Sequence, residues 1–146
     1  NAISDASQFN VITISNNSVI TWSASQVIQG GCLVHTGTFG SAVSDAIDTA
    51  ANIGAYLQQI IPGAAANPLI LNGFVFRFRL VNLNSAAQTL TLNGTSAGVT
   101  YTSGAPGLLT MAQNIWRDFV CTLTVTANPT TFSVAVVSVG TNASAI

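Results

Sequence analysis

Charged side chains are almost missing from this chain. Lysine and glutamate do not occur, and charged residues make up 5% of the 146 positions, against about 25% in ordinary soluble domains. Three arginines and four aspartates leave a formal net charge of −1. Nucleic-acid binding needs many cations to displace counterions, so the composition argues against a nucleic-acid partner.

Long apolar runs are missing as well, although the mean hydropathy is +0.53. Thr, Ser, Asn and Gln interrupt every apolar segment before it reaches the roughly 18 residues that a membrane span needs. We therefore expect no membrane partner. A monomer with so few charges would be poorly soluble, because a net charge near zero favours association between molecules. The composition thus favours an obligate oligomer over a monomer whose surface is solvated by Ser, Thr and Asn.

Groups for catalysis or metal binding are scarce. The one histidine, His35, lies in an apolar strand pattern and is interpreted as a packing residue rather than a general base. Cys32 and Cys121 lack the spacing of zinc ligands, and a buried free thiol is the favoured interpretation of Cys121. Asp45 and Asp48 could clasp a calcium ion, but their position before a predicted helix favours a structural role. The sequence therefore predicts no enzyme, no cofactor and no metal.

Most of the chain consists of short segments rich in Val, Ile, Thr and aromatic residues, separated by Gly, Asn, Pro and Ser. This pattern is typical of β-strands joined by turns. The predicted strands are 9–15, 19–23, 31–36, 73–82, 88–93, 98–102, 116–127 and 131–139.

One segment has helical periodicity instead. Ile53, Leu57 and Ile60 follow a helical spacing, with Asp48 or Thr49 as the N-cap and Pro62-Gly63 as the stop signal. We therefore predict a mainly β protein, an antiparallel jelly-roll-like β-sandwich with one short α-helix at about residues 49–61.

Two of the three arginines lie two positions apart in GFVFRFRLVN (73–82). Strand alternation places Phe74, Phe76, Phe78 and Leu80 on one face, which we predict to be core. Arg77 and Arg79 share the other face with Val75 and Val81.

No phosphate or substrate pocket is evident for these arginines. We predict that one forms a bidentate pair with an aspartate (Asp118 first, Asp45 or Asp48 next) and that the other lines a subunit or capsid contact. If that pair is buried, removing one partner should cost about 3–5 kcal/mol.

The order of features resembles a β domain found in phage and large-DNA-virus structural proteins. The resemblance spans roughly residues 18–140. It is carried by the helix DTAANIGAYLQQIIPGAA (48–65), the strand and hairpin FRFRLVNLNSAAQTLTLNG (76–94), the strand MAQNIWRDFVCTLTV (111–125) and the final strand FSVAVVSVG (132–140).

This resemblance implies a non-enzymatic virion structural protein. It favours a homotrimeric capsid decoration (cement) protein that binds the major capsid protein on the outer surface of the virion and stabilises the shell. The alternative is a fibre-head or carbohydrate-binding adhesion module on a viral or cell surface, with a host-surface glycan as its ligand. Trp22, Tyr56, Tyr101 and Trp116 could serve as sugar-stacking platforms, although Trp116 is more typical of a core anchor.

Two segments depart from the resembling domain, the first by having no counterpart and the second by being longer than expected, and both are candidates for attachment to a partner. Residues 1–17 are interpreted as an N-terminal strand or arm, and residues 18–146 as the β-sandwich domain. The second segment is the insertion 63–73. Attachment elements tend to be loops carried on a rigid scaffold. The predicted subunit or capsid contacts are Asn1, Asp5, Asn67, Pro68, Arg77, Arg79 and Asp118.

Overall fold

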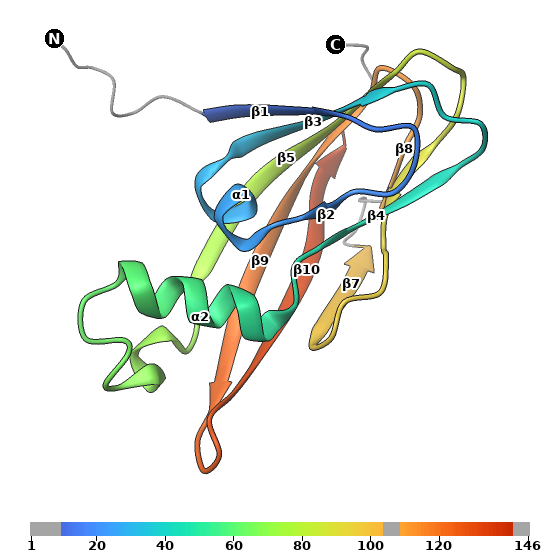
Figure 1. Ribbon diagram of the computed structural model, residues 1–146. Coiled ribbons are helices and arrows are strands. Elements are labelled where there is room, and N and C mark those ends of the chain that lie inside the picture. Colours follow the sequence, from blue (N-terminus) through green and yellow to red (C-terminus); the bar gives the residue numbers. More distant parts are fainter. Residues whose placement is uncertain (1–9, 104–108, 142–146) are drawn as a thin grey trace, which may run out of the picture.

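The computed structural model describes residues 10–103 and 109–141, and it is mainly β, with two sheets and two α-helices in that part of the chain (Figure 1). The larger sheet has six strands in the order β1 (Asn10–Ser15), β3 (Gly31–Gly37), β5 (Val75–Asn84), β9 (Trp116–Thr126), β10 (Thr131–Thr141) and β7 (Val99–Ser103). The smaller sheet has four strands in the order β2 (Thr21–Trp22), β4 (Val43–Ile47), β6 (Leu90–Leu92) and β8 (Thr110–Met111). The helices are α1 (Ala24–Gln29), α2 (Ala50–Ile60) and the short 3₁₀ helix η2 (Pro68–Leu71).

The two sheets enclose one hydrophobic core. Buried side chains from both sheets and both α-helices form a single cluster, which includes Trp22 of β2, Leu80 of β5 and Phe119 of β9. The smaller sheet is too short to cover the long strands β9 and β10. The helix α2 lies along the part that remains and packs against β10 (Figure 1).

Most neighbouring strands run parallel. The pairs β1–β3, β3–β5, β7–β10, β2–β4 and β4–β6 are parallel, and the pairs β5–β9, β9–β10 and β6–β8 are antiparallel. The prediction of an antiparallel sandwich is therefore wrong, and the jelly-roll order is not confirmed.

The reason for the parallel pairing is that successive strands alternate between the sheets. From β1 to β9, every odd-numbered strand belongs to the larger sheet and every even-numbered strand to the smaller one. A chain that crosses to the opposite sheet before returning can enter the first sheet again in its original direction. Parallel neighbours require such a crossover, whereas a tight hairpin makes antiparallel neighbours.

The predicted core face of β5 is confirmed. Phe76, Phe78 and Leu80 are buried, with exposed fractions of 6%, 3% and 0%, and Phe74 is partly buried against the same core. The inner face continues to the buried amide side chains of Asn82 and Asn84. Asn82 Nδ2 donates to the carbonyl oxygens of Gln88 and Met111, which satisfies this buried polar group.

The residues between the predicted strands 19–23 and 31–36 form a helix, α1, that the sequence pattern does not predict. Ser23 and Gln26 form a capping box: the Ser23 hydroxyl accepts from the Gln26 backbone, and the Gln26 side chain accepts from the Ser23 backbone. This exchange satisfies two backbone donors at the start of the helix. Val27 is then fully buried. Local hydrogen bonding thus overrides the β propensity of the preceding residues.

The helix predicted at residues 49–61 is confirmed as α2, Ala50–Ile60. Thr49 is the N-cap, and its side chain accepts from the Asn52 backbone at 3.2 Å. Ile53 and Leu57 are fully buried, as their spacing predicts. Ile60 is 44% exposed, so its predicted place on the buried face is wrong; it is the last residue of the helix.

Close packing of α2 on β10 depends on Gly54. A Cβ atom at this position would lie 2.5 Å from the ring of Phe132. Real Cβ atoms do not approach other atoms so closely, so the helix can contact the strand at this distance only because residue 54 has no side chain.

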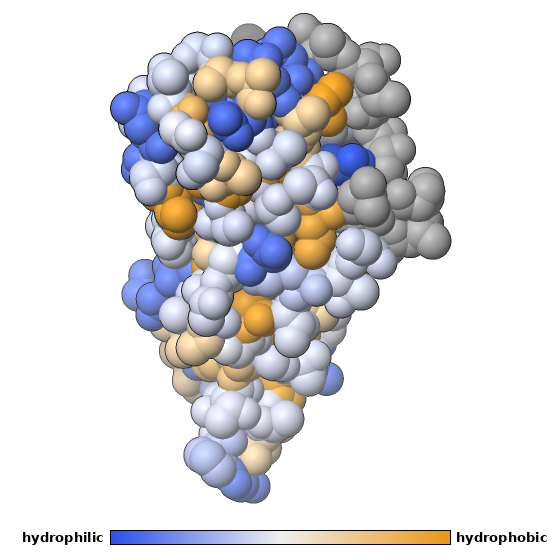
Figure 2. Space-filling model, turned by 90° about the vertical axis from the view of Figure 1, so that its right-hand side faces the viewer, coloured by the Kyte–Doolittle hydropathy of each residue, from blue (hydrophilic) through white to orange (hydrophobic). Residues whose placement is uncertain are grey.

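The surface has few charged residues to draw on, because the chain contains three arginines and four aspartates. On the side shown in Figure 2, residues of intermediate hydropathy predominate between small hydrophobic and hydrophilic groups. Within residues 10–103 and 109–141, no helix is long and apolar enough to cross a membrane.

We expect Gly54→Ala to destabilise the protein by about 1–3 kcal/mol, because overpacking against Phe132 outweighs the better helix propensity of alanine. Urea unfolding measures the change. The control is Gln59→Ala at an exposed position of the same helix, which should change stability by less than about 0.5 kcal/mol. An unchanged or raised stability of Gly54→Ala would contradict the packing described for α2.

Candidate functional site

The six-stranded sheet has one face turned away from the core, which we call the outer face. It is formed by the alternate strand residues whose neighbours in sequence point into the core. Its central members are Cys32, Val34, Val75, Arg77, Arg79, Val81, Trp116, Asp118, Val120, Thr122, Ala135, Val137 and Val139. The described helices contribute their buried residues to the core on the opposite side. Val75 and Val139 on the outer face are 50% and 37% exposed.

Arg79 and Asp118 form the predicted bidentate pair. They lie directly opposite each other on the antiparallel strands β5 and β9. Arg79 Nε donates to Asp118 Oδ1 at 2.7 Å, and Arg79 Nη2 donates to Asp118 Oδ2 at 3.1 Å. The hydrogen bond to Asp118 raises the pKa of Arg79 above its usual value. Each side chain is more than a third exposed, at 37% and 41%, so the pair is not the buried one to which the cost of 3–5 kcal/mol would apply.

The ring of Trp116 packs against the guanidinium group of Arg79 in the same pair. Arg79 Cζ lies 3.4 Å from the centroid of the Trp116 ring, a cation–π contact between residues of neighbouring strands. Trp116 is two positions before Asp118 and therefore shares its face. The predicted role of Trp116 as a core anchor is wrong: it is partly buried on the outer face, and the tryptophan of the core is Trp22.

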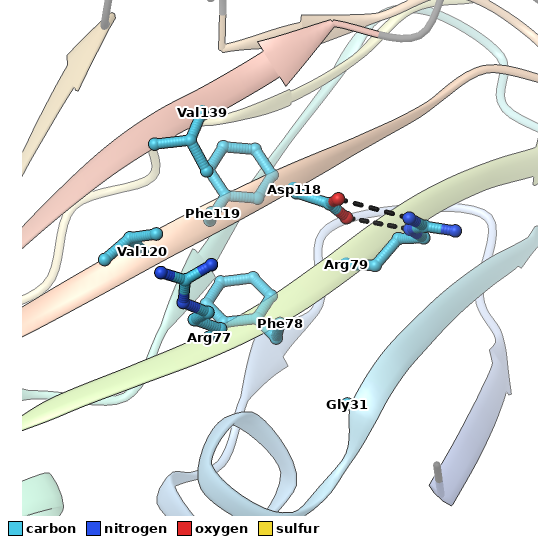
Figure 3. Close-up of a pocket in the computed structure, with 8 residues that line it drawn as sticks. All are labelled: Gly31, Arg77, Phe78, Arg79, Asp118, Phe119, Val120 and Val139. Atoms are coloured by element: carbon cyan, nitrogen blue, oxygen red, sulfur yellow. Dashed lines mark hydrogen bonds and ion pairs between the residues drawn. The ribbon is translucent and has the colours of Figure 1, made fainter.

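Arg77 lies beside a pocket of about 210 Å³ on this sheet. The pocket is lined by Gly31, Arg77, Phe78, Arg79, Asp118, Phe119, Val120 and Val139. The guanidinium group of Arg77 lies next to Val120 and points away from the Arg79–Asp118 pair (Figure 3). Arg77 is exposed, and within the described residues no hydrogen bond or ion pair involves its side chain. The structure thus brings Arg77, Arg79 and Asp118 together.

The other predicted contact residues do not join this group. Asn67 is exposed and precedes η2, which begins at Pro68. Neither residue lines the pocket. Their loop presents Leu69 and Ile70, which are 49% and 50% exposed. Asn1 and Asp5 lie outside the described residues, and residues 10–15 of the predicted N-terminal segment form the edge strand β1. A role for any of these residues in binding stays a prediction.

A second polar group is buried between the two sheets. Asp45 of β4 accepts from the Ile20 backbone at 2.9 Å and from Trp22 Nε1 at 3.0 Å. His35 of β3 lies with Nδ1 2.7 Å from Asp45 Oδ2 and with Nε2 3.0 Å from the Asn16 carbonyl oxygen. Both His35 and Asp45 are fully buried.

The partners of His35 fix where its protons lie. A carbonyl oxygen only accepts, so Nε2 carries a proton that it donates to Asn16. A second proton lies on the short bond between His35 Nδ1 and Asp45 Oδ2, since two bare acceptors would repel at this distance. With both ring nitrogens engaged and no exposed surface, His35 is a packing and hydrogen-bonding residue, as its strand position predicted.

The predicted helix-start role is wrong for Asp45 and right for Asp48. Asp45 lies inside β4, ahead of the helix, whereas Asp48 Oδ1 accepts from the Thr49 backbone and the Asn52 side chain, each at 2.8 Å. The two carboxylates therefore have separate donors and do not share an open calcium site. Within the described residues, no group of three or more His, Cys, Asp or Glu could hold a metal ion.

The aromatic candidates for sugar stacking are buried or partly buried. Trp22 is fully buried. The Tyr101 hydroxyl accepts from the Ile47 backbone at 3.0 Å, and burial raises the pKa of Tyr101. Tyr56 is partly buried against the core. On the outer face Arg79 covers one side of the Trp116 ring.

Both cysteines are free thiols, and Cys121 is buried as predicted. Burial raises the pKa of the Cys121 thiol far above its usual value. Burial also raises the pKa of Cys32, which is partly offset by the nearby charge of Arg79. A raised pKa leaves little reactive thiolate at neutral pH, so neither residue has the properties of a nucleophile.

The Arg79–Asp118 pair should contribute about 0.2–1 kcal/mol, the range for solvent-screened ion pairs. We expect Arg79→Ala and Asp118→Ala each to destabilise the protein, and the double variant to cost less than the sum of the two. Urea unfolding of the four proteins gives the coupling free energy. Strict additivity would mean that the two side chains do not stabilise each other.

The buried pair of His35 and Asp45 should contribute more to stability than the Arg79–Asp118 pair. We expect Asp45→Ala to cost about 3–5 kcal/mol, because it leaves the buried donors of Ile20, Trp22 and His35 without an acceptor. Asp48→Ala is the matched control: it removes a partly exposed carboxylate at a helix start and should cost about 1 kcal/mol. Equal losses for the two variants in urea unfolding would contradict the central role of Asp45.

Comparison with known proteins finds no relative of this chain. No family model, no curated protein and no solved structure matches the chain.

Proposed function

We propose that this chain is a non-enzymatic virion structural protein, a homotrimeric capsid decoration protein that binds the major capsid protein and stabilises the shell from its outer surface. The virion context comes from the resemblance of residues 18–140 to domains of phage and large-DNA-virus structural proteins.

The observation that carries the proposal is the outer face of the six-stranded sheet. A sheet face of Val, Thr and Ala side chains is typical of a surface that another protein covers. Of its three charged groups, Arg79 and Asp118 neutralise each other. Such a face loses little solvation of charge when a partner excludes water from it, which favours a protein interface over a free surface.

The groups that catalysis would need are engaged elsewhere. His35 has both ring nitrogens hydrogen-bonded in the core, and Cys121 is buried with a raised pKa. A general base has to reach substrate, which His35 in this position does not do. This arrangement supports a binding role over an enzymatic one.

A trimer is compatible with the different surfaces of the molecule. Contacts between two different patches, repeated around an axis, close into a ring when the rotation is right. In such a ring other patches of each protomer would pack against its neighbour, and the outer face would remain free to bind the capsid. The loop that contains Asn67 and Pro68 would remain available for the capsid, as would the N-terminal residues Asn1 and Asp5.

We expect the protein to sediment as a trimer, in solution or once bound to particles. Because it would bind the assembled lattice rather than the free subunit, it should stabilise the shell by mass action. Particles that lack it should therefore assemble normally but lose tolerance to heat. Analytical ultracentrifugation and thermal-release assays of particles test both points, with particles reconstituted with the purified protein as the control. A monomer that also fails to bind particles would exclude this function.

A further inference from the structure

We propose that the pocket at Arg77 is the point at which the outer face recognises a partner protein, and that the partner fills it with the carboxylate of an aspartate or glutamate side chain. The inference rests on the proposed function and specifies the chemistry of the capsid surface that this chain would bind.

Charge on the outer face points to an anionic partner. The face carries two cations and one anion among its described residues. The anion, Asp118, is held by two hydrogen bonds from Arg79, and Arg79 is further engaged on the ring of Trp116. Among the residues that the structure describes, this leaves the positive charge of Arg77 without a counter-charge.

The other described aspartates are not available to Arg77, in the same protomer or in a second copy. Asp45 is fully buried. Asp48 holds the donors of Ala24, Thr49 and Asn52. Each described carboxylate thus already has its donors, which favours a complement to Arg77 outside the described residues, and we place it on a different protein.

The pocket has the size and lining for one acidic side chain. Its volume of about 210 Å³ equals that of roughly seven water molecules at about 30 Å³ each. This is enough for a carboxylate and its methylene groups, whereas a branched glycan would extend beyond it. Val120 and Val139 provide apolar wall for the methylene groups, and Arg77 provides the two-pronged donor that suits a carboxylate.

Covering the outer face would strengthen this contact. When a partner excludes water, the ion pair is screened less and its Coulomb attraction increases. An arginine at the centre of a desolvated interface is typical of a residue that dominates binding energy. Lysine would supply the charge at this position but not the planar fork.

The first experiment tests the pocket alone, by NMR of the purified protein labelled on arginine. Sodium acetate is the probe, and acetamide is its neutral match. We expect a saturable shift of the Arg77 Nε–H signal with acetate at millimolar concentration, no shift with acetamide, and no comparable shift of the paired Arg79. An acetate response that is absent, or equal at Arg77 and Arg79, overturns the carboxylate site whatever the function of the protein.

N-acetylneuraminic acid, a sugar that bears a carboxylate, is the third probe in this titration. Affinity within a factor of about three of acetate supports a site that reads the carboxylate alone. Binding at least tenfold tighter than acetate would mean that the pocket recognises the sugar, and would replace the protein partner with a glycan.

The second experiment compares binding of variants to particles that lack the protein. We expect Arg77→Gln to weaken binding at least tenfold and Arg77→Lys to weaken it by a smaller factor. Gln59→Ala, at an exposed position of α2 on the other side of the sheet, is the control and should bind like the wild type. Circular dichroism melting of each variant verifies its fold.

The outcomes separate the two proposals. If the wild type binds particles and Arg77→Gln binds them equally well, the role of Arg77 is overturned but the decoration function is not. A wild type that fails to bind particles overturns the decoration function, and the acetate titration then still decides whether the pocket takes a carboxylate.

Discussion

The carboxylate of Asp45 in β4 is hydrogen-bonded to segments of the chain that lie far apart in sequence and in different sheets. It accepts hydrogen bonds from the backbone of Ile20, from the indole of Trp22 and from the ring of His35. Ile20 and Trp22 belong to the segment of β2, whereas His35 lies on β3 in the opposite sheet. The hydrophobic effect is not directional, so by itself it specifies the relative position of two sheets less strictly than hydrogen bonds do. A buried carboxylate with three directional donors permits one arrangement, because any shift leaves a buried donor without an acceptor.

The local elements were predictable where one segment contains its own signals. The helix α2 has a capping threonine, two core residues at helical spacing and a terminal Pro-Gly, all within one stretch of chain. The inner face of β5 follows from the alternation of Phe76, Phe78 and Leu80. The helix α1 was missed because its start depends on one capping exchange, between Ser23 and Gln26, inside a segment with strand-like composition. Strand direction was missed because alternation within a strand carries no information about which sheet the next strand enters.

The two ion pairs also differ in how far the sequence could predict them. The pair of Arg79 and Asp118 was predictable because the chain has so few charges that an arginine on a strand has few possible partners. The pair of His35 and Asp45 was not, since neither residue has a local signal that distinguishes it from an isolated polar residue. A lone aspartate in the apolar segment AVSDAI (42–47) is the sign that could have been used, because a carboxylate in a buried strand requires donors from elsewhere. Trp116 was placed in the core because its size favours burial, but β9 turns it to the outer face, where Arg79 covers it.

The alternation of strands between the sheets also determines how this chain can reach its native state. Cys32 on β3 lies opposite Arg79 on β5, and Arg79 lies opposite Asp118 on β9, so each neighbour is supplied by a segment about forty or more positions away. Loop closure over such distances costs entropy before any contact compensates for it, and folds dominated by non-local pairing are slow to form. During synthesis, β3 cannot pair with β5, its second neighbour in the sheet, until β4 and α2, which come before β5 in the chain, have emerged. The protein is therefore expected to fold late and as a whole. Among the described strands, only β9 and β10 both follow each other along the chain and pair with each other.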